Sequence, residues 1–236
     1  MESILSWIRS YRECVEGLGY DLFEMLLLGL GFISWVTAYY FIIKGVRKNQ
    51  TCEMPMLVAA GNIAWEFYWS FIGDPDLGEP FQWGCRIWFC MDLFINYSVF
   101  KYGRKLVTLP ILKKYWFQTW AFAWVLWFEI VYFMDREGND NPLGVVSAII
   151  INVVMSGLYI YQLLNYPELR GKGFSIHAAW LKMIGTGSIS VASFFLWSHN
   201  EWLLSMCVAT FVLDIVYISL YYNYKPEIIE TEYSIS

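Results

Sequence analysis

The sequence is poor in charged residues and has no basic excess. Only 16% of its 236 residues are charged, and the net charge is −5; a typical soluble domain has about 25% charged residues. A nucleic-acid-binding protein needs a basic surface, so no nucleic-acid partner is expected. The five cysteines form no CxxC pair, which argues against both a zinc site and a disulfide framework.

Several enzyme motifs are also missing. The chain contains no Gly-rich phosphate-binding loop, no GxSxG nucleophile turn and no HExxH metal motif. The last apolar segment contains no lysine that could bind retinal as a Schiff base. We therefore expect neither a bound cofactor nor a metal ion.

Apolar and aromatic residues dominate instead, at 58% and 20% of the chain. They gather in seven segments of about 20 residues, the length that crosses the ~30 Å hydrocarbon core of a bilayer as a helix. A membrane barrel would show alternating segments of about 10 residues. The pattern predicts an all-α polytopic membrane protein, a seven-transmembrane-helix bundle with spans at 22–43, 54–73, 83–100, 115–134, 143–164, 176–197 and 201–222.

The first 21 residues are predicted to form a separate interfacial segment. Their apolar side chains recur at spacings of three and four, which is one face of an amphipathic helix lying on the membrane; a frayed polar tail is the alternative. These side chains are Ile4, Ile8, Tyr11, Val15 and Leu18. We expect one membrane domain at 22–222 and an acidic cytosolic tail at 223–236.

The loop charges predict an orientation. The loops after the first, third and fifth spans, together with Lys225, carry 11 basic residues, and the opposite side carries 3. The positive-inside rule places the 11 in the cytosol, so the N-terminus is expected to be lumenal and the C-terminus cytosolic.

Ionisable side chains inside spans are costly and mark functional sites by default. Three acids lie near mid-bilayer depth: at 1.5 Å per residue, Glu66 is ~10 Å, Asp92 ~14 Å and Asp214 ~20 Å from the outer end of its span. Glu129 is shallower, and the only bases inside spans are Arg86 and Lys182. Interhelical pairing of acids with these two bases is the structural alternative, but two bases cannot serve every acid.

Each deep acid has polar or aromatic neighbours on its own helix face. These neighbours are Asn62 and Trp69 for Glu66; Trp88 and Asn96 for Asp92; Thr210, Tyr217 and Tyr221 for Asp214. We expect the three faces to point into one shared interior.

The string Asn62-Ile63-Ala64-Trp65-Glu66 in the second of seven spans resembles the small integral-membrane terpene cyclases of fungal meroterpenoid and indole-diterpene pathways, the pyripyropene- and paxilline-type cyclases. The resemblance continues in Phe211-Val212-Leu213-Asp214 with Tyr217, and it covers the whole chain in length and span number. The Asn-Ile-Ala-Trp-Glu string is fairly specific, whereas one Asp in an apolar helix is not.

The resemblance implies a metal-independent cyclase, because the Asp-rich DDxxD motif of many other terpene synthases is missing. Glu66 and Asp214 match the family's two acids, which protonate the terminal epoxide of a farnesyl- or geranylgeranyl-bearing aromatic, polyketide or indole substrate. The expected partners are this lipophilic substrate and membrane lipid, in the endoplasmic reticulum; the oligomeric state stays open. Supporting or pocket residues are expected to be Asn62, Trp65, Trp69, Asp92, Asn96, Thr210 and Tyr217.

Elementary chemistry is compatible with this role. A carboxyl group held out of water keeps its proton at neutral pH, and of two acids in one cavity one can stay protonated while the other ionises. Two other classes remain open. A proton-coupled transporter also buries acids near the midplane, and a non-catalytic seven-helix protein would need them only for packing.

Overall fold

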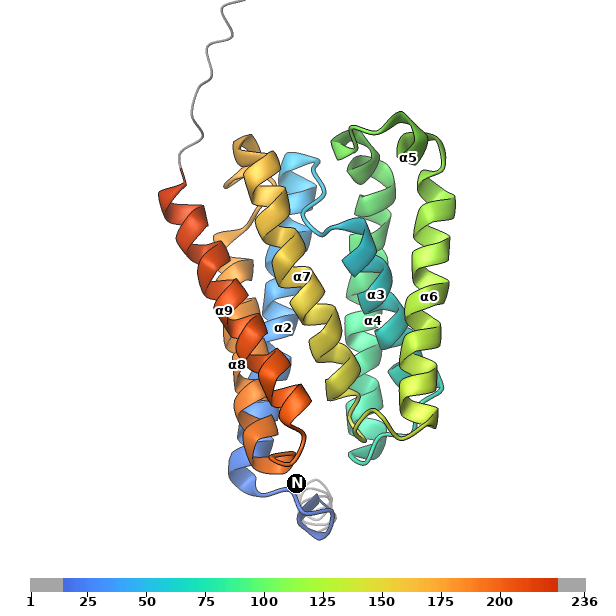
Figure 1. Cartoon of the computed structure of the whole chain (residues 1–236), viewed down its shortest axis with the longest axis vertical. Coiled ribbons are helices and arrows are strands. Elements are labelled where there is room, and N and C mark those ends of the chain that lie inside the picture. Colours follow the sequence, from blue (N-terminus) through green and yellow to red (C-terminus); the bar gives the residue numbers. More distant parts are fainter. Residues whose placement is uncertain (1–14, 225–236) are drawn as a thin grey trace, which may run out of the picture.

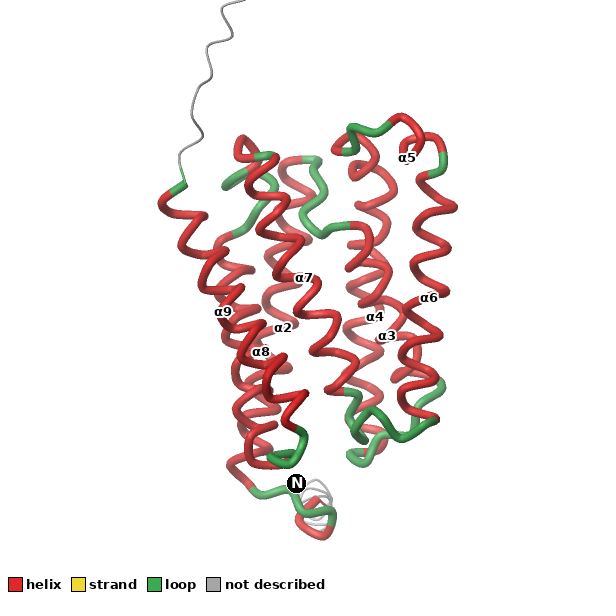
Figure 2. Tube along the Cα trace, in the orientation of Figure 1, coloured by secondary structure: helices red, strands yellow, loops and turns green. Residues whose placement is uncertain are grey.

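The computed structural model describes residues 15–224, and within that range the chain is all α-helical, without a strand (Figures 1 and 2). Short loops at the two ends of the bundle join the long helices, with two 3-10 turns and the five-residue α5 (Pro110–Lys114) among the connections. The long helices are α2 (Leu22–Asn49), α3 (Met56–Phe71), α4 (Gly78–Tyr102), α6 (Trp116–Arg136), α7 (Val145–Asn165), α8 (Ile176–Leu196) and α9 (Glu201–Asn223).

The all-α prediction is confirmed, whereas the number of membrane spans stays a prediction. Five helices, namely α2, α6, α7, α8 and α9, are long and apolar enough to cross a membrane. Helix α3 has only 16 residues, and α4 is diluted by Glu79, Arg86, Asp92 and Lys101. Most of the predicted interfacial segment at 1–21, and all of the tail from 225 on, lie outside the described residues.

Two helices extend well beyond the predicted spans. Helix α2 continues from Ile43 to Asn49 and ends at Gln50, whose φ of 55° terminates it in the left-handed region. Helix α4 begins at Gly78, five residues before the predicted start at Trp83. An apolar segment marks only the part of a helix that can face lipid. The helix itself can be longer, because its backbone hydrogen bonds also form between polar residues. The start of α2 is fixed by a capping box, in which the Asp21 side chain accepts from Glu24 N and the buried Glu24 side chain accepts from Asp21 N.

The helices form two groups (Figure 1). In one group α2 packs on α8, α8 on α9 and α9 on α7; in the other α3 packs on α4 and α6. Contacts of α2 with α4, and of α3 with α7, join the groups. Glu66 on α3 bonds to Tyr39 on α2 across this junction, whereas Asp214 and Lys182 lie within the first group.

Helix α8 runs unbroken through its glycines and serines, which diluted the sixth predicted span. A Cβ on Gly185 would lie 2.9 Å from Trp35 Cδ1, and one on Gly31 only 2.6 Å from Ile189 Cγ1, so both glycines permit a close approach of α2 and α8. The hydroxyls of Ser188, Ser190 and Ser193 bond to carbonyls of α8 itself. The glycines therefore allow close helix packing, and the serine hydroxyls are satisfied within α8, so neither breaks the helix.

The start of α7 is locked against α3. Gly144 has a φ of +65°, and any Cβ there would collide with the ring of Trp69. Trp65 Nε1 donates to the Gly144 carbonyl at 3.0 Å and lies 3.0 Å from Ser147 Oγ. These contacts fix the position of α3, which carries Glu66, along the start of α7.

Candidate active site

A largely apolar cavity of about 270 Å³ lies between the two helix groups. Side chains from α2, α3, α4, α7 and α8 line it, and its aromatic members are Phe32, Trp35, Trp65, Phe81 and Trp88. Phe32 and Trp88 are in direct ring contact, with centroids 4.8 Å apart. A long hydrocarbon chain is the kind of ligand that such a cavity suits.

Glu66 lines a smaller neighbouring cavity of about 80 Å³. Trp35, Trp65 and Trp88 belong to the walls of both cavities, and Asn62 and Asn152 add polar groups to the smaller one. Trp65 and Trp88 lie with ring centroids 6.3 Å apart. The carboxyl group is thus placed at one side of the apolar chamber.

The Glu66 carboxyl group has only neutral hydrogen-bond partners. The Tyr39 hydroxyl on α2 donates to Oε1 at 3.0 Å, and Asn62 Nδ2 donates to the Tyr39 oxygen at 2.9 Å. The other carboxyl oxygen, Oε2, is buried and has no protein partner among the described residues. Glu66 is only 4% exposed.

Asp92 is a second buried acid behind Glu66. Its side chain is fully buried, accepts from Asn96 Nδ2 at 3.2 Å, and leaves Oδ1 without a partner in the described chain. Asn96 also donates to the Ala59 carbonyl and accepts from Trp120. If Glu66 and Asp92 were both ionised, their carboxylates would lie close enough to repel each other.

Neither in-span base serves these two acids. Arg86 donates to the Ser70 carbonyl at 3.2 Å and lies over the Trp83 ring, while Lys182 bonds to Asp214. The alternative in which Asp92 pairs with one of these bases is therefore wrong. A buried carboxylate with neither a cation nor several donors is very costly, so both Glu66 and Asp92 are expected to hold their protons.

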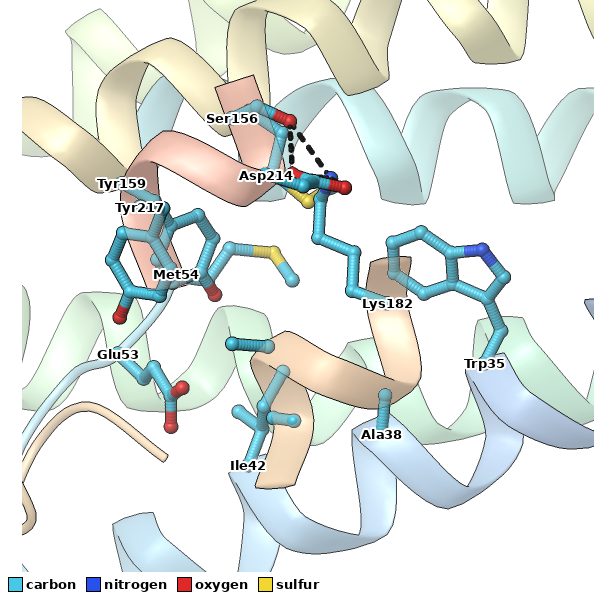
Figure 3. A pocket seen from close by; sticks show the side chains of 13 residues that line it. Trp35, Ala38, Ile42, Glu53, Met54, Ser156, Tyr159, Lys182, Asp214 and Tyr217 are labelled. Carbon is cyan, nitrogen blue, oxygen red and sulfur yellow. Dashed lines mark hydrogen bonds and ion pairs between the residues drawn. The ribbon is translucent and has the colours of Figure 1, made fainter. Parts of the chain in front are cut away.

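Asp214 has the opposite environment (Figure 3). Lys182 Nζ lies 2.7 Å from Oδ1 and 2.9 Å from Oδ2, and Ser156 Oγ lies 2.7 Å from Oδ1. Asp214 lines a third cavity of about 20 Å³, with Trp35 in its wall as in the other two. Glu66 and Asp214 thus line neighbouring cavities, which differs from the single shared interior that the sequence predicts.

The other predicted site residues divide into three sets. Asn62 and Trp65 line the Glu66 cavity, and Asn96 holds Asp92. Tyr217 lines the Asp214 cavity, where its ring meets Tyr159 edge-on with centroids 5.6 Å apart. Like Asp92 and Asn96, the last two residues line none of the three cavities: Trp69 is buried against Gly73 and Gly144, and the Thr210 hydroxyl bonds to Met206.

Sequence reasoning missed Tyr39, Ser156 and Glu53. Tyr39 and Ser156 are ordinary members of apolar helices, and only the hydrogen bonds from α2 to α3, and from α7 to α9, reveal their partners. Glu53 precedes α3, lines the Asp214 cavity and accepts from Ser175 N at 2.9 Å. Burial raises the pKa of Glu53 from 4.5 to about 8, partly offset by that hydrogen bond. Nothing in the sequence indicates that Glu53, a single acid in a short loop, is buried.

Comparison with known proteins settles the family. The model of the Pyr4-like transmembrane terpene cyclases matches residues 19–227. The chain belongs to this family. The match includes all seven long helices of the described residues and the three deep acids Glu66, Asp92 and Asp214. This terpene cyclase is accordingly an integral membrane protein.

Curated relatives are fungal terpene cyclases. The chain is 24% identical over 207 residues to the terpene cyclase olcD of Penicillium canescens, an alignment that covers 83% of each chain. It is 23% identical over 173 residues to the Pyr4-family terpene cyclase mfmH of Annulohypoxylon moriforme, covering 71% of this chain and 67% of that one. No solved structure matches the chain.

Proposed function

We propose that this cyclase protonates the terminal epoxide of a prenylated aromatic, polyketide or indole substrate through Glu66, and drives carbocation cyclisation without a metal ion. The observation that carries the proposal is the contrast between Asp214 and Glu66. Asp214 is bound through both oxygens by Lys182, whereas among residues 15–224 buried Glu66 has no cation beside it and no partner for Oε2. A proton donor must be protonated and accessible, which favours Glu66.

The proposed reaction begins when the Glu66 proton moves to the epoxide oxygen. The bond from that oxygen to the more substituted carbon breaks, leaving a hydroxyl group and a tertiary carbocation. Neighbouring alkenes attack in turn, and each new carbon–carbon bond moves the positive charge along the chain. A proton finally leaves carbon, so substrate and product are isomers. The leaving proton balances the one that Glu66 gave.

The aromatic walls support the cationic stages of this reaction. Trp35, Trp65 and Trp88 offer ring faces to the cavities beside Glu66, and such faces stabilise cations by about 2 kcal/mol or more when water is excluded. Exclusion of water also protects the cations from premature capture. A chamber lined by polar side chains could do neither.

Asp214 is proposed to act as the ionised member of the two acids. Lys182 holds it as a carboxylate, so it cannot donate a proton, but its negative charge lies in a cavity next to that of Glu66, across Trp35. From there it can stabilise positive charge or accept the proton lost at the end. Asn62 and Trp65 would then shape the Glu66 side, and Tyr217 the Asp214 side.

The test is to express the chain in a microbial host that makes no related terpenoids. Epoxyfarnesyl- and epoxygeranylgeranyl-aryl compounds are supplied, and products are analysed by mass spectrometry and NMR. The proposal expects cyclised isomers of the same mass as the epoxide that carry a new hydroxyl group. Uncyclised epoxide with every such substrate, in cells that contain folded protein, would contradict it.

A further inference from the structure

We propose that Tyr39 is a positioning residue that fixes the Glu66 proton on Oε2, the oxygen to which no described residue bonds. The inference rests on the proposed role of Glu66 as the acid. It concerns a residue of the first long helix that neither the sequence motif nor the family match singles out.

The direction of the hydrogen bonds carries the inference. Asn62 Nδ2 can only donate, and it lies 2.9 Å from the Tyr39 oxygen. That oxygen therefore acts as acceptor toward Asn62, and the single hydroxyl hydrogen of Tyr39 is available for its other partner, Glu66 Oε1, at 3.0 Å. Asn62 thus orients Tyr39, and Tyr39 donates to one defined carboxyl oxygen.

This donation selects where the carboxylic proton lies. A protonated carboxyl group has one carbonyl oxygen, which accepts, and one hydroxyl oxygen, which donates. Because Oε1 accepts from Tyr39, the proton is placed on Oε2, which is buried and has no partner in the described chain. An epoxide oxygen that reaches Oε2 would accept the hydrogen bond that no described residue accepts from it.

The same bond becomes stronger when the proton leaves. Glu66 is then a carboxylate, and hydrogen bonds to charged acceptors are about twice as strong as neutral ones. Packing fixes the Tyr39 ring in place: Tyr39 is only 3% exposed, and its ring contacts Trp35 edge-on with centroids 5.8 Å apart. A bond that gains strength only as charge develops raises kcat without changing substrate binding.

Tyr39→Phe tests the inference, and Tyr68→Phe is its matched control. Tyr68 is also a buried tyrosine, and its hydroxyl also donates to a carboxyl group, that of Asp135, but it lines none of the three cavities. We expect kcat for an accepted epoxide to fall about 10²-fold in Tyr39→Phe, the loss seen when one preorganised donor is removed, with KM unchanged. Tyr68→Phe should keep both values.

Infrared spectroscopy gives a readout that does not depend on turnover. The difference between wild type and Glu66→Gln isolates the carbonyl band of protonated Glu66. That band should move to higher frequency in Tyr39→Phe, because the hydrogen bond to Oε1 is lost, and should stay in place in Tyr68→Phe. Asn62→Leu, which removes the donor to Tyr39 but keeps the hydroxyl, should move it in the same direction by less; this variant decides the matter if Tyr39→Phe does not fold.

The outcomes separate the two proposals. A Glu66 band that does not move in Tyr39→Phe or Asn62→Leu, or an equal loss of kcat in Tyr68→Phe, overturns the role of Tyr39. A band that moves as expected in a protein that cyclises no epoxide upholds the placement of the proton and contradicts the proposed function instead.

Discussion

Lys182 Nζ on α8 lies 2.7 Å from Asp214 Oδ1 and 2.9 Å from Oδ2 on α9, in a part of the bundle where both side chains are buried. The pair also shares Ser156 of α7, so it ties three helices together. This contact makes Asp214 a structural residue as well as a candidate for chemistry. Single substitutions cannot separate the two roles, because either one leaves a buried charge unpaired.

A double substitution at this pair separates folding from chemistry. Asp214→Asn alone should destabilise the protein by about 3–5 kcal/mol, because it leaves the Lys182 ammonium buried and unpaired. Adding Lys182→Met removes that charge and should restore the thermal stability of the detergent-solubilised protein. Product formation should stay lost in the double variant, because the carboxylate is still missing. A double variant that regains both stability and product would reduce Asp214 to a packing role.

Glu53 should make stability depend on pH. Its pKa is raised by burial from 4.5 to about 8, so between these values the folded protein keeps a proton that the unfolded chain has released. The free energy of unfolding should therefore fall as pH rises through this window, by up to about 1.4 kcal/mol per pH unit. Glu53→Gln removes the titrating group and should flatten the unfolding temperature between pH 5 and pH 8.

The matched control for this titration is Glu168→Gln. Glu168 is an exposed acid at the same end of the bundle, and its substitution should leave the slope as in wild type. Identical slopes in wild type and Glu53→Gln would show that Glu53 does not hold a proton in the folded protein.

Hydropathy along the sequence predicts where the long helices lie better than where they end. Apolar runs of about 20 residues located all seven long helices, because burying or facing lipid with that length needs a helix. Helix ends were less accurate: the capping box of Asp21 and Glu24 and the extension of α2 to Asn49 depend on local hydrogen bonds rather than on hydropathy.

The site was only partly predictable for a related reason. Glu66, Asp92 and Asp214 stand out because acids are rare inside apolar helices, and their depth follows from the helical rise. Their partners lie on other helices: Tyr39 is 27 positions from Glu66, and Lys182 is 32 positions from Asp214. One sequence does not report which faces meet, so the acid that bonds to a lysine and the acid that does not could not be told apart.

The basic residues predict the orientation in the membrane. With 11 on the side expected to be cytosolic and 3 on the other, a tag after Ser236 should be digested by protease added to sealed microsomes. A tag before Met1 should be protected. Protection of the C-terminal tag would reverse the proposed orientation.

Turnover should survive chelation of divalent metal ions. In the proposed reaction the leaving bond is activated by the Glu66 proton, so no metal is needed to draw off a leaving group. Product formation with and without excess EDTA, in extensively dialysed membranes, measures this. Loss of product in EDTA that magnesium restores would contradict the proposed activation step.

The central claim is that Glu66 gives the proton that starts cyclisation, and Glu66→Gln tests it most directly. Glutamine keeps the shape and can still accept from Tyr39, but it has no carboxylic proton to give. The control is Glu129→Gln, because Glu129 is an acid on the exposed face of α6 that lines none of the three cavities. We predict that Glu66→Gln folds as wild type does while product formation falls by about 10²–10⁴-fold, and that Glu129→Gln keeps its activity. Near-normal product from folded Glu66→Gln would contradict the claim.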